Sequence, residues 1–144
     1  MRIENRILFL AVGVAALVAS RLDAAEIEWQ TDEAKTLQHA ASAKRPVIVF
    51  VTTPSCSYCA LMHRKTFRDP AVVEKVNRSF AALAIDGEQR PQLMEQLGVR
   101  AFPTVLVVMP DRKVAAFKEG FQSPVEFQRF LDKAVKGAPA AGRQ

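Results

Sequence analysis

The sequence has little cysteine and little histidine, the residues that most often bind transition metals: each occurs only twice among 144 residues. A structural zinc ion needs a full set of tetrahedral ligands, so both histidines would have to join both cysteines at one point. Long apolar runs are also missing, because the longest, residues 7–19, is shorter than the roughly 18 residues of a membrane-spanning helix. These absences argue against a zinc protein and against a confident membrane span.

A concentrated basic patch is absent as well. Basic side chains outnumber acidic ones by 20 to 15, but their pairs lie far apart, at residues 44–45, 64–65 and 112–113. A nucleic-acid site would require clustered positive charge, so we expect a solvated surface and no nucleic-acid partner. The length fits a single domain, and no internal repeat indicates a second one.

The chain begins with a pattern typical of a secretory signal peptide. Arg2 and Arg6 precede the apolar run, whose length suits the hydrophobic region of such a peptide. We expect residues 1–25 to be this signal peptide, cleaved after Ala24 or Ala25, and the alternative is an uncleaved N-terminal membrane anchor. Export to the periplasm or beyond would place the protein in an oxidising compartment.

Hydrophobic patterning predicts one α/β domain over residues 26–137 and a disordered tail over residues 138–144. Strands separated by helices favour a parallel core, and the last two strands are expected to form an antiparallel hairpin. The expected strands cover residues 27–29, 47–52, 80–86, 104–109 and 114–117. The expected helices cover residues 32–44, 60–67, 70–76, 91–97 and 124–135.

Two of these helices have apolar faces that predict how they pack. In the first helix the face consists of Ala34, Leu37 and Ala41. The last helix opens with a capping box at residues 123–126, and its face consists of Phe127, Phe130, Leu131, Ala134 and Val135. We also place Phe67 and Phe80 in the core.

Both cysteines lie in the hexapeptide PSCSYC, residues 54–59, between an apolar run and a helix-compatible run. Cys56 therefore begins a helix, where free N–H groups and the helix dipole stabilise a thiolate, the nucleophile of thiol chemistry. Cys59 lies one helical turn later and can attack a mixed disulfide formed by Cys56. A disulfide that closes so short a loop contributes little to the stability of the fold. The pattern thus predicts redox exchange, with Cys56 attacking and Cys59 resolving.

Three other interpretations of the pair remain open. The cysteines could form a passive pair, or bind Cu(I) with the help of Met62, because thiolates and thioethers suit that ion. His63 completes a Cys-x-x-Cys-x-x-x-His pattern on one helical face, but a zinc ion would also need His39. We predict no metal and no cofactor, and interpret His63 as a surface residue.

The Cys-x-x-Cys after a buried strand, together with Phe102-Pro103-Thr104 before another, resembles the thioredoxin superfamily over roughly residues 27–136. The chain is most similar to exported thioredoxin-like proteins and to the reducing domains of membrane disulfide reductases. The resemblance implies the thioredoxin fold, a central mixed sheet of four to five strands with helices on both faces. It also implies that Pro103 is a cis-proline and that Phe102 offers its backbone to substrate. Tyr58 is either a substrate-facing ring or merely a helix residue.

The chain departs from the thioredoxin pattern in two ways. The tryptophan before the first cysteine is replaced by Ser55, and the family's buried acid and its lysine partner fall on Phe50 and Ala82. What is lost is the group that the resemblance assigns to deprotonating the second cysteine. This loss suggests a narrower substrate range.

These observations predict an exported thiol–disulfide oxidoreductase, acting on protein thiols or disulfides as a reductase. Electrons would come from a membrane-bound disulfide reductase or pass to an oxidase, and we expect a monomer. The alternative is a non-enzymatic binding module or copper chaperone that uses the same groove.

Overall fold

The computed structural model describes residues 25–137, so the expected signal peptide and the expected C-terminal tail fall outside the described residues, apart from Ala25. Five strands lie in one sheet, in the spatial order β1-β3-β2-β4-β5. They are β1 (Trp29–Gln30), β2 (Val47–Thr52), β3 (Ala81–Asp86), β4 (Thr104–Val108) and β5 (Val114–Glu119). The helices are α1 (Glu33–Ser42), α2 (Ser57–Lys65), α3 (Pro70–Ser79), α4 (Pro91–Leu97) and α5 (Pro124–Gly137). This is the element order that the sequence predicts.

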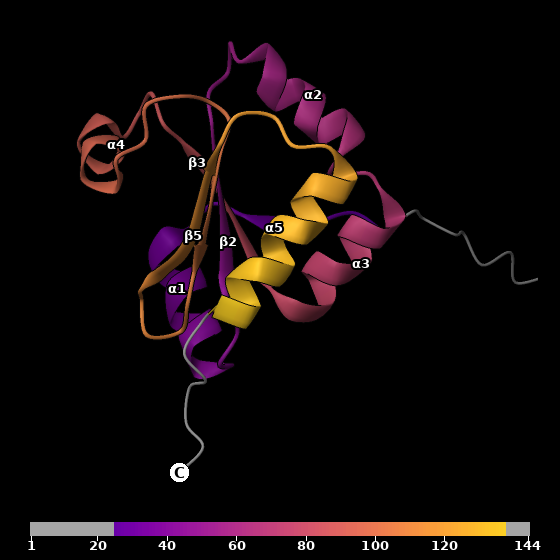
Figure 1. Cartoon of the computed structure of the whole chain (residues 1–144). Coiled ribbons are helices and arrows are strands. Elements are labelled where there is room, and N and C mark those ends of the chain that lie inside the picture. The colour runs from indigo at the N-terminus through magenta and orange to yellow at the C-terminus, as the bar shows by residue number, and fades with distance from the viewer. Residues whose placement is uncertain (1–24, 138–144) are drawn as a thin grey trace, which may run out of the picture.

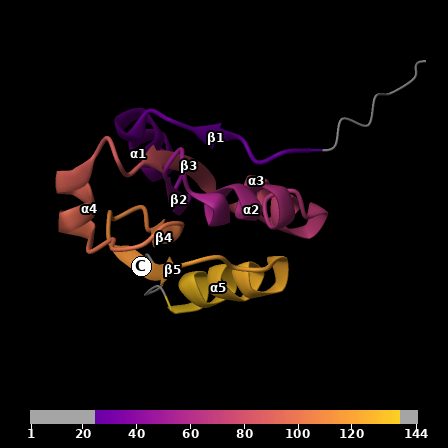
Figure 2. The ribbon, with the colours of Figure 1, turned by 90° about the horizontal axis from the view of Figure 1, so that it is seen from above.

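The sheet is mixed and lies between two layers of helices (Figures 1 and 2). Strands β1, β3 and β2 run parallel, whereas β4 is antiparallel to β2 and β5 is antiparallel to β4. Helices α2, α3 and α5 contribute to the core on one face, and α1 and α4 to the core on the other. The predicted α/β architecture with helices on both faces is therefore confirmed.

Strand β2 is the centre of the sheet and is buried on both faces, as its uninterrupted apolar sequence predicts. Ile48 and Phe50 point into the core beneath α2, α3 and α5, and Val47, Val49 and Val51 into the other. Because β2 pairs with β3 and β4 along nearly its whole length, its end is held on both sides. The segment that follows it is thus anchored to the most rigid part of the sheet.

The helix boundaries follow local signals in the sequence. The side chain of Asp32 accepts a hydrogen bond from the N–H of Lys35, and that of Asp69 accepts from two N–H groups at the start of α3. Gly98 ends α4 in the left-handed conformation, at φ 70°. Ser123 and Glu126 form the expected capping box before α5.

The predicted faces of two helices need correction. In α1 the buried residues are Thr36 and Ala40, while Ala34 is exposed. Thr36 can be buried because its hydroxyl donates to the carbonyl oxygen of Asp32, at 2.6 Å. In α5 the buried stripe is narrower than expected and consists of Phe127, Leu131 and Ala134; Phe130 is half-buried and Val135 is 47% exposed.

Two details of the sheet also differ from expectation. Strand β1 is two residues long and starts at Trp29 rather than Ile27, although Ile27 is buried in the core. Strand β5 extends to Glu119 and forms an edge of the sheet, with most of its side chains exposed. None of the helices within residues 25–137 is long and apolar enough to cross a membrane.

Candidate active site

The two cysteines lie where the central strand passes into a helix. After β2 ends at Thr52, three residues lead to Cys56, which is the N-cap residue of α2 and has extended backbone angles. The N–H of Cys59 donates to the Sγ atom of Cys56, at 3.1 Å. In this structure the two cysteines are joined as a disulfide. The sequence-predicted placement of the pair at a strand end and a helix start is what the structure shows.

The two sulfur-bearing residues differ in exposure. Cys56 is half-buried and reaches the surface, whereas Cys59 is only 2% exposed. An incoming thiol or disulfide can therefore meet Cys56 more readily than Cys59. This asymmetry fits the predicted roles, in which Cys56 attacks and Cys59 resolves, and the roles themselves stay predictions.

The loop before β4 lies beside the cysteine loop because Thr104 pairs with Val51, near the end of β2. The peptide bond between Phe102 and Pro103 is cis, the isomer that the resemblance implies. Pro103 is buried, and its carbonyl oxygen accepts a hydrogen bond from the N–H of Gly120, at 2.7 Å. The loop is thereby held between β2 and the connection from β5 to α5.

The half-buried ring of Phe102 packs against both halves of the core, while the contact of its backbone with substrate stays a prediction. The ring lies over Gly87, the first residue after β3. A Cβ atom built on Gly87 would come within 2.5 Å of Cε1 of Phe102. The N–H of Gly87 also donates to the carbonyl oxygen of Thr52, at 2.9 Å, which ties it to the end of β2.

Residues 86–88 follow the end of a strand, a pattern typical of a simple turn, and nothing else in their sequence indicates this support. The only signal was the glycine itself, directly after a strand that runs parallel to the strand leading to the cysteines. Its contact with Phe102 joins positions fifteen residues apart in the chain, and no local pattern predicts it.

Tyr58 is in the first turn of α2, two residues after Cys56, and is 62% exposed. It is the most exposed of the large apolar or aromatic side chains identified in residues 25–137. An exposed ring next to the half-buried sulfur fits a substrate-facing role better than a packing role. Its contact with substrate stays a prediction.

His63 is exposed, as expected of a surface residue, but its ring also packs against other rings. It makes edge-to-face contacts with Phe50, at 5.1 Å between ring centroids, with Phe67 at 5.3 Å, and with Trp29 at 6.3 Å. Burial among these rings, assisted by the positive charge of Arg68, lowers the pKa of His63 from its ordinary value. The interpretation of His63 as a plain surface residue is therefore incomplete.

The two positions that lack the family's polar pair are both buried in apolar surroundings. Phe50 is fully buried and Ala82 is 5% exposed. Met62, considered as a copper ligand, is likewise fully buried in the core. Within residues 25–137 there is no group of three or more histidine, cysteine or acidic side chains placed to hold a metal ion.

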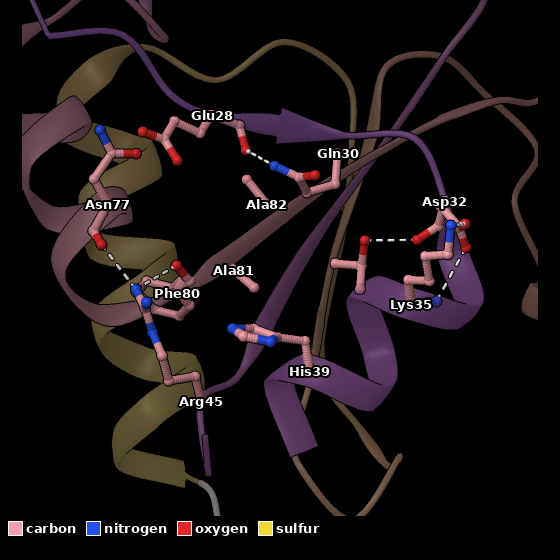
Figure 3. Close-up of a pocket in the computed structure, with 11 residues that line it drawn as sticks. Glu28, Gln30, Asp32, Lys35, His39, Arg45, Asn77, Phe80, Ala81 and Ala82 are labelled. Atoms are coloured by element: carbon pink, nitrogen blue, oxygen red, sulfur yellow. Dashed lines mark hydrogen bonds and ion pairs between the residues drawn. The ribbon is translucent and has the colours of Figure 1, made fainter. Parts of the chain in front are cut away.

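A pocket of about 530 Å³ lies at the other end of the sheet, near the start of β3 (Figure 3). Most of the charges on its walls are already paired within the protein. Lys35 forms an ion pair with Asp32, at 3.2 Å. Arg45 donates to the carbonyl oxygens of Asn77 and Phe80, at 2.8 and 2.6 Å. The pocket therefore contributes nothing to the cysteine site.

Comparison with known proteins agrees with this geometry. Residues 33–135 match the family described as thioredoxin-like domains. A thioredoxin from Thermus thermophilus is 21% identical, with a TM-score of 0.69 and coverage of 78% of this chain and 91% of that one. The DsbH oxidoreductase is 18% identical, with a TM-score of 0.68 and coverage of 83% of this chain and 92% of that one. These likenesses confirm the thioredoxin fold.

Two further matches differ in extent. The C-terminal domain of DsbD from Neisseria meningitidis, solved in the oxidised form, is 20% identical, with a TM-score of 0.59 and coverage of 72% of this chain and 97% of that one. An uncharacterised protein of Caenorhabditis elegans is 27% identical over 67 residues, 46% of this chain. The chain matches only 9% of the length of that relative.

The contact between Gly87 and Phe102 leads to a first prediction. Gly87→Ala should destabilise the protein by about 1–3 kcal/mol, because the new methyl group overlaps the ring and something must move. Urea unfolding measures the loss. Gly137→Ala is the matched control, since a Cβ atom there meets nothing within 4 Å. Combining Gly87→Ala with Phe102→Leu should recover part of the loss, and equal effects at the two glycines would contradict the contact.

Proposed function

Because the chain belongs to the thioredoxin-like family, and its Cys-x-x-Cys pair makes the described domain a thiol–disulfide oxidoreductase, we propose that the protein is exported and reduces protein disulfides. The observation that carries the proposal is the position of Cys56 as the half-buried N-cap residue of α2. Reduced Cys56 attacks a substrate disulfide, and Cys59 then displaces the substrate from the mixed disulfide.

The charges around the cysteine loop support the reducing direction. The hydroxyl of Ser55, next to Cys56, donates to the carboxylate of Glu88, at 3.5 Å. The arginine and lysine of α2, Arg64 and Lys65, lie in its last turn and not in the first turn that follows Cys56. A nearby carboxylate disfavours a thiolate. A pair whose reduced form is less stabilised is a stronger reductant.

The surface around Cys56 suits an extended protein substrate. Tyr58 offers an exposed ring in the first turn of α2, and the loop of Phe102 and Pro103 lies beside the end of β2 that leads to Cys56. The expected signal peptide and the likeness to the DsbD domain together support a membrane-bound disulfide reductase as electron donor. The alternative is a copper chaperone or a passive binding module, and the trapping experiment below distinguishes it from the oxidoreductase.

Trapping of a mixed disulfide tests the activity. Cys59→Ser removes the resolving thiol, so this variant should accumulate covalent adducts with substrate proteins that added thiol releases. Cys56→Ser should trap few, because its remaining thiol is buried. Capture from cell extract, followed by mass spectrometry, measures both variants against the double serine variant as control. If Cys59→Ser traps no more than that control, the oxidoreductase proposal is wrong and copper titration becomes the next test.

The reduction potential tests the direction. Equilibration with glutathione should give a value nearer to about −270 mV, typical of thioredoxin, than to about −120 mV, typical of a strong oxidant. Glu88→Gln should raise the potential by about 10–30 mV, because it removes the charge that disfavours the thiolate. Glu95→Gln, an exposed position on α4, is the matched control. A potential near the oxidant value would reverse the proposed direction.

Localisation is tested separately. The mature protein should begin at Ala25 or Glu26 and be recovered outside the cytoplasm in soluble form. Cell fractionation and N-terminal sequencing measure this. A full-length chain that sediments with membranes would favour the uncleaved anchor, and a full-length chain in the cytoplasm would refute export.

A further inference from the structure

The buried resolving cysteine needs a proton acceptor. Cys59 is 2% exposed and packs in the apolar core beneath α2. Its thiol must lose a proton before it can attack the mixed disulfide, and burial in apolar surroundings opposes that loss. The strand positions Phe50 and Ala82 carry no group that could take the proton.

The helix itself provides one candidate. Among the residues of α2 one turn before or after Cys59, His63 is the only one whose ordinary side-chain pKa lies near neutrality. Side chains four positions apart on a helix have Cβ atoms about 5–6 Å apart. Helical side chains also point back towards the N-terminus. His63 therefore lies on the same face of α2 as Cys59, one turn further along the helix.

The contacts of the ring hold it over this part of the core. His63 lies edge-to-face with Phe50, the residue at the missing acid's position. It also contacts Trp29, whose strand position pairs with Ala82, the residue at the missing lysine's position. One titratable side chain on α2 thus packs against Phe50 itself and against Trp29, the strand neighbour of Ala82.

The charge state of the ring suits a proton acceptor. The side chains that face it from β1, from β2 and from the segment after α2 are the uncharged rings of Trp29, Phe50 and Phe67. Arg68 adds positive charge beyond the helix end, and Arg64 and Lys65 flank His63 on α2 itself. Burial and Arg68 lower the pKa of His63 from its ordinary value, which favours the neutral imidazole with its free lone pair.

We propose that His63 accepts the proton of Cys59 in the resolving step, an inference that rests on the proposed function. The proton passes from Sγ of Cys59 to the imidazole, directly or across one water. The thiolate then attacks Sγ of Cys56, the Cys56–Cys59 bond forms, and the bond between Cys56 and the substrate sulfur breaks. The substrate leaves as a thiolate and takes up the proton, so the substrate disulfide gains the two electrons that the cysteine pair loses.

Reaction of the reduced protein with dithiobis(nitrobenzoate) separates the two steps, because each releases one coloured thiolate. The first phase reports attack by Cys56 and the second reports resolution by Cys59. His63→Gln should slow the second phase by about 100-fold at pH 7 and leave the first within about twofold. His39→Gln, at the other histidine and in the pocket of Figure 3, should change neither phase.

Three readouts distinguish proton transfer from a packing role. The deficit of His63→Gln should shrink as the pH rises to about 9, because solvent hydroxide then deprotonates Cys59. His63→Phe should preserve the aromatic packing and the unfolding midpoint but remain slow. Added imidazole should accelerate the second phase of His63→Ala. A second phase that His63→Phe restores, or that keeps the same deficit at every pH, would overturn the assignment.

The same experiment distinguishes a failure of the oxidoreductase proposal from a failure of the role proposed for His63. If wild-type protein gives no first phase, the oxidoreductase proposal fails and the role of His63 falls with it. If both phases are present and His63→Gln matches wild type in each, the role of His63 is wrong while the oxidoreductase stands.

Discussion

The hydrogen bond from the N–H of Cys59 to the sulfur of Cys56 is the interaction on which the site depends. It exists because α2 begins at the residue after Cys56, and α2 begins there because β2 ends in the middle of the sheet. A helix start that drifted by one residue would leave that N–H without the sulfur. Strands β3 and β4, which hold β2 on both sides, therefore contribute to the chemistry although they carry neither cysteine.

The features that the sequence predicts well are local ones. Three examples are the start of α3 at Asp69-Pro70, the end of α4 at Gly98 and the apolar run of β2. Each signal acts within a few residues, so the local sequence alone identifies it. The same holds for the cysteine pair at a helix start. The likeness to a known family adds the cis bond at Pro103, which spacing alone does not predict.

The features that the sequence does not predict depend on contacts between distant segments of the chain. Val135 follows the apolar period of α5 but lies beyond the narrow stripe that the sheet covers. Gly87 supports Phe102 only because the end of β3 meets the loop before β4. His63 looks like a polar residue on a helix, and its neighbours Trp29 and Phe50 come from two different strands. The role of each of these residues becomes visible only once the tertiary arrangement is known.

Strand β5 has a consequence for how the molecule meets other copies of itself. It is hydrogen-bonded to β4 on one side, and its other side is an open row of backbone groups of the kind that templates aggregation. The register shifts at Val107 and Val108, which bends the end of the hairpin. Lys118 and Glu119 add exposed charge at the other end. The edge is therefore poorly suited to pairing with a further strand, and this opposes aggregation of the domain through β5.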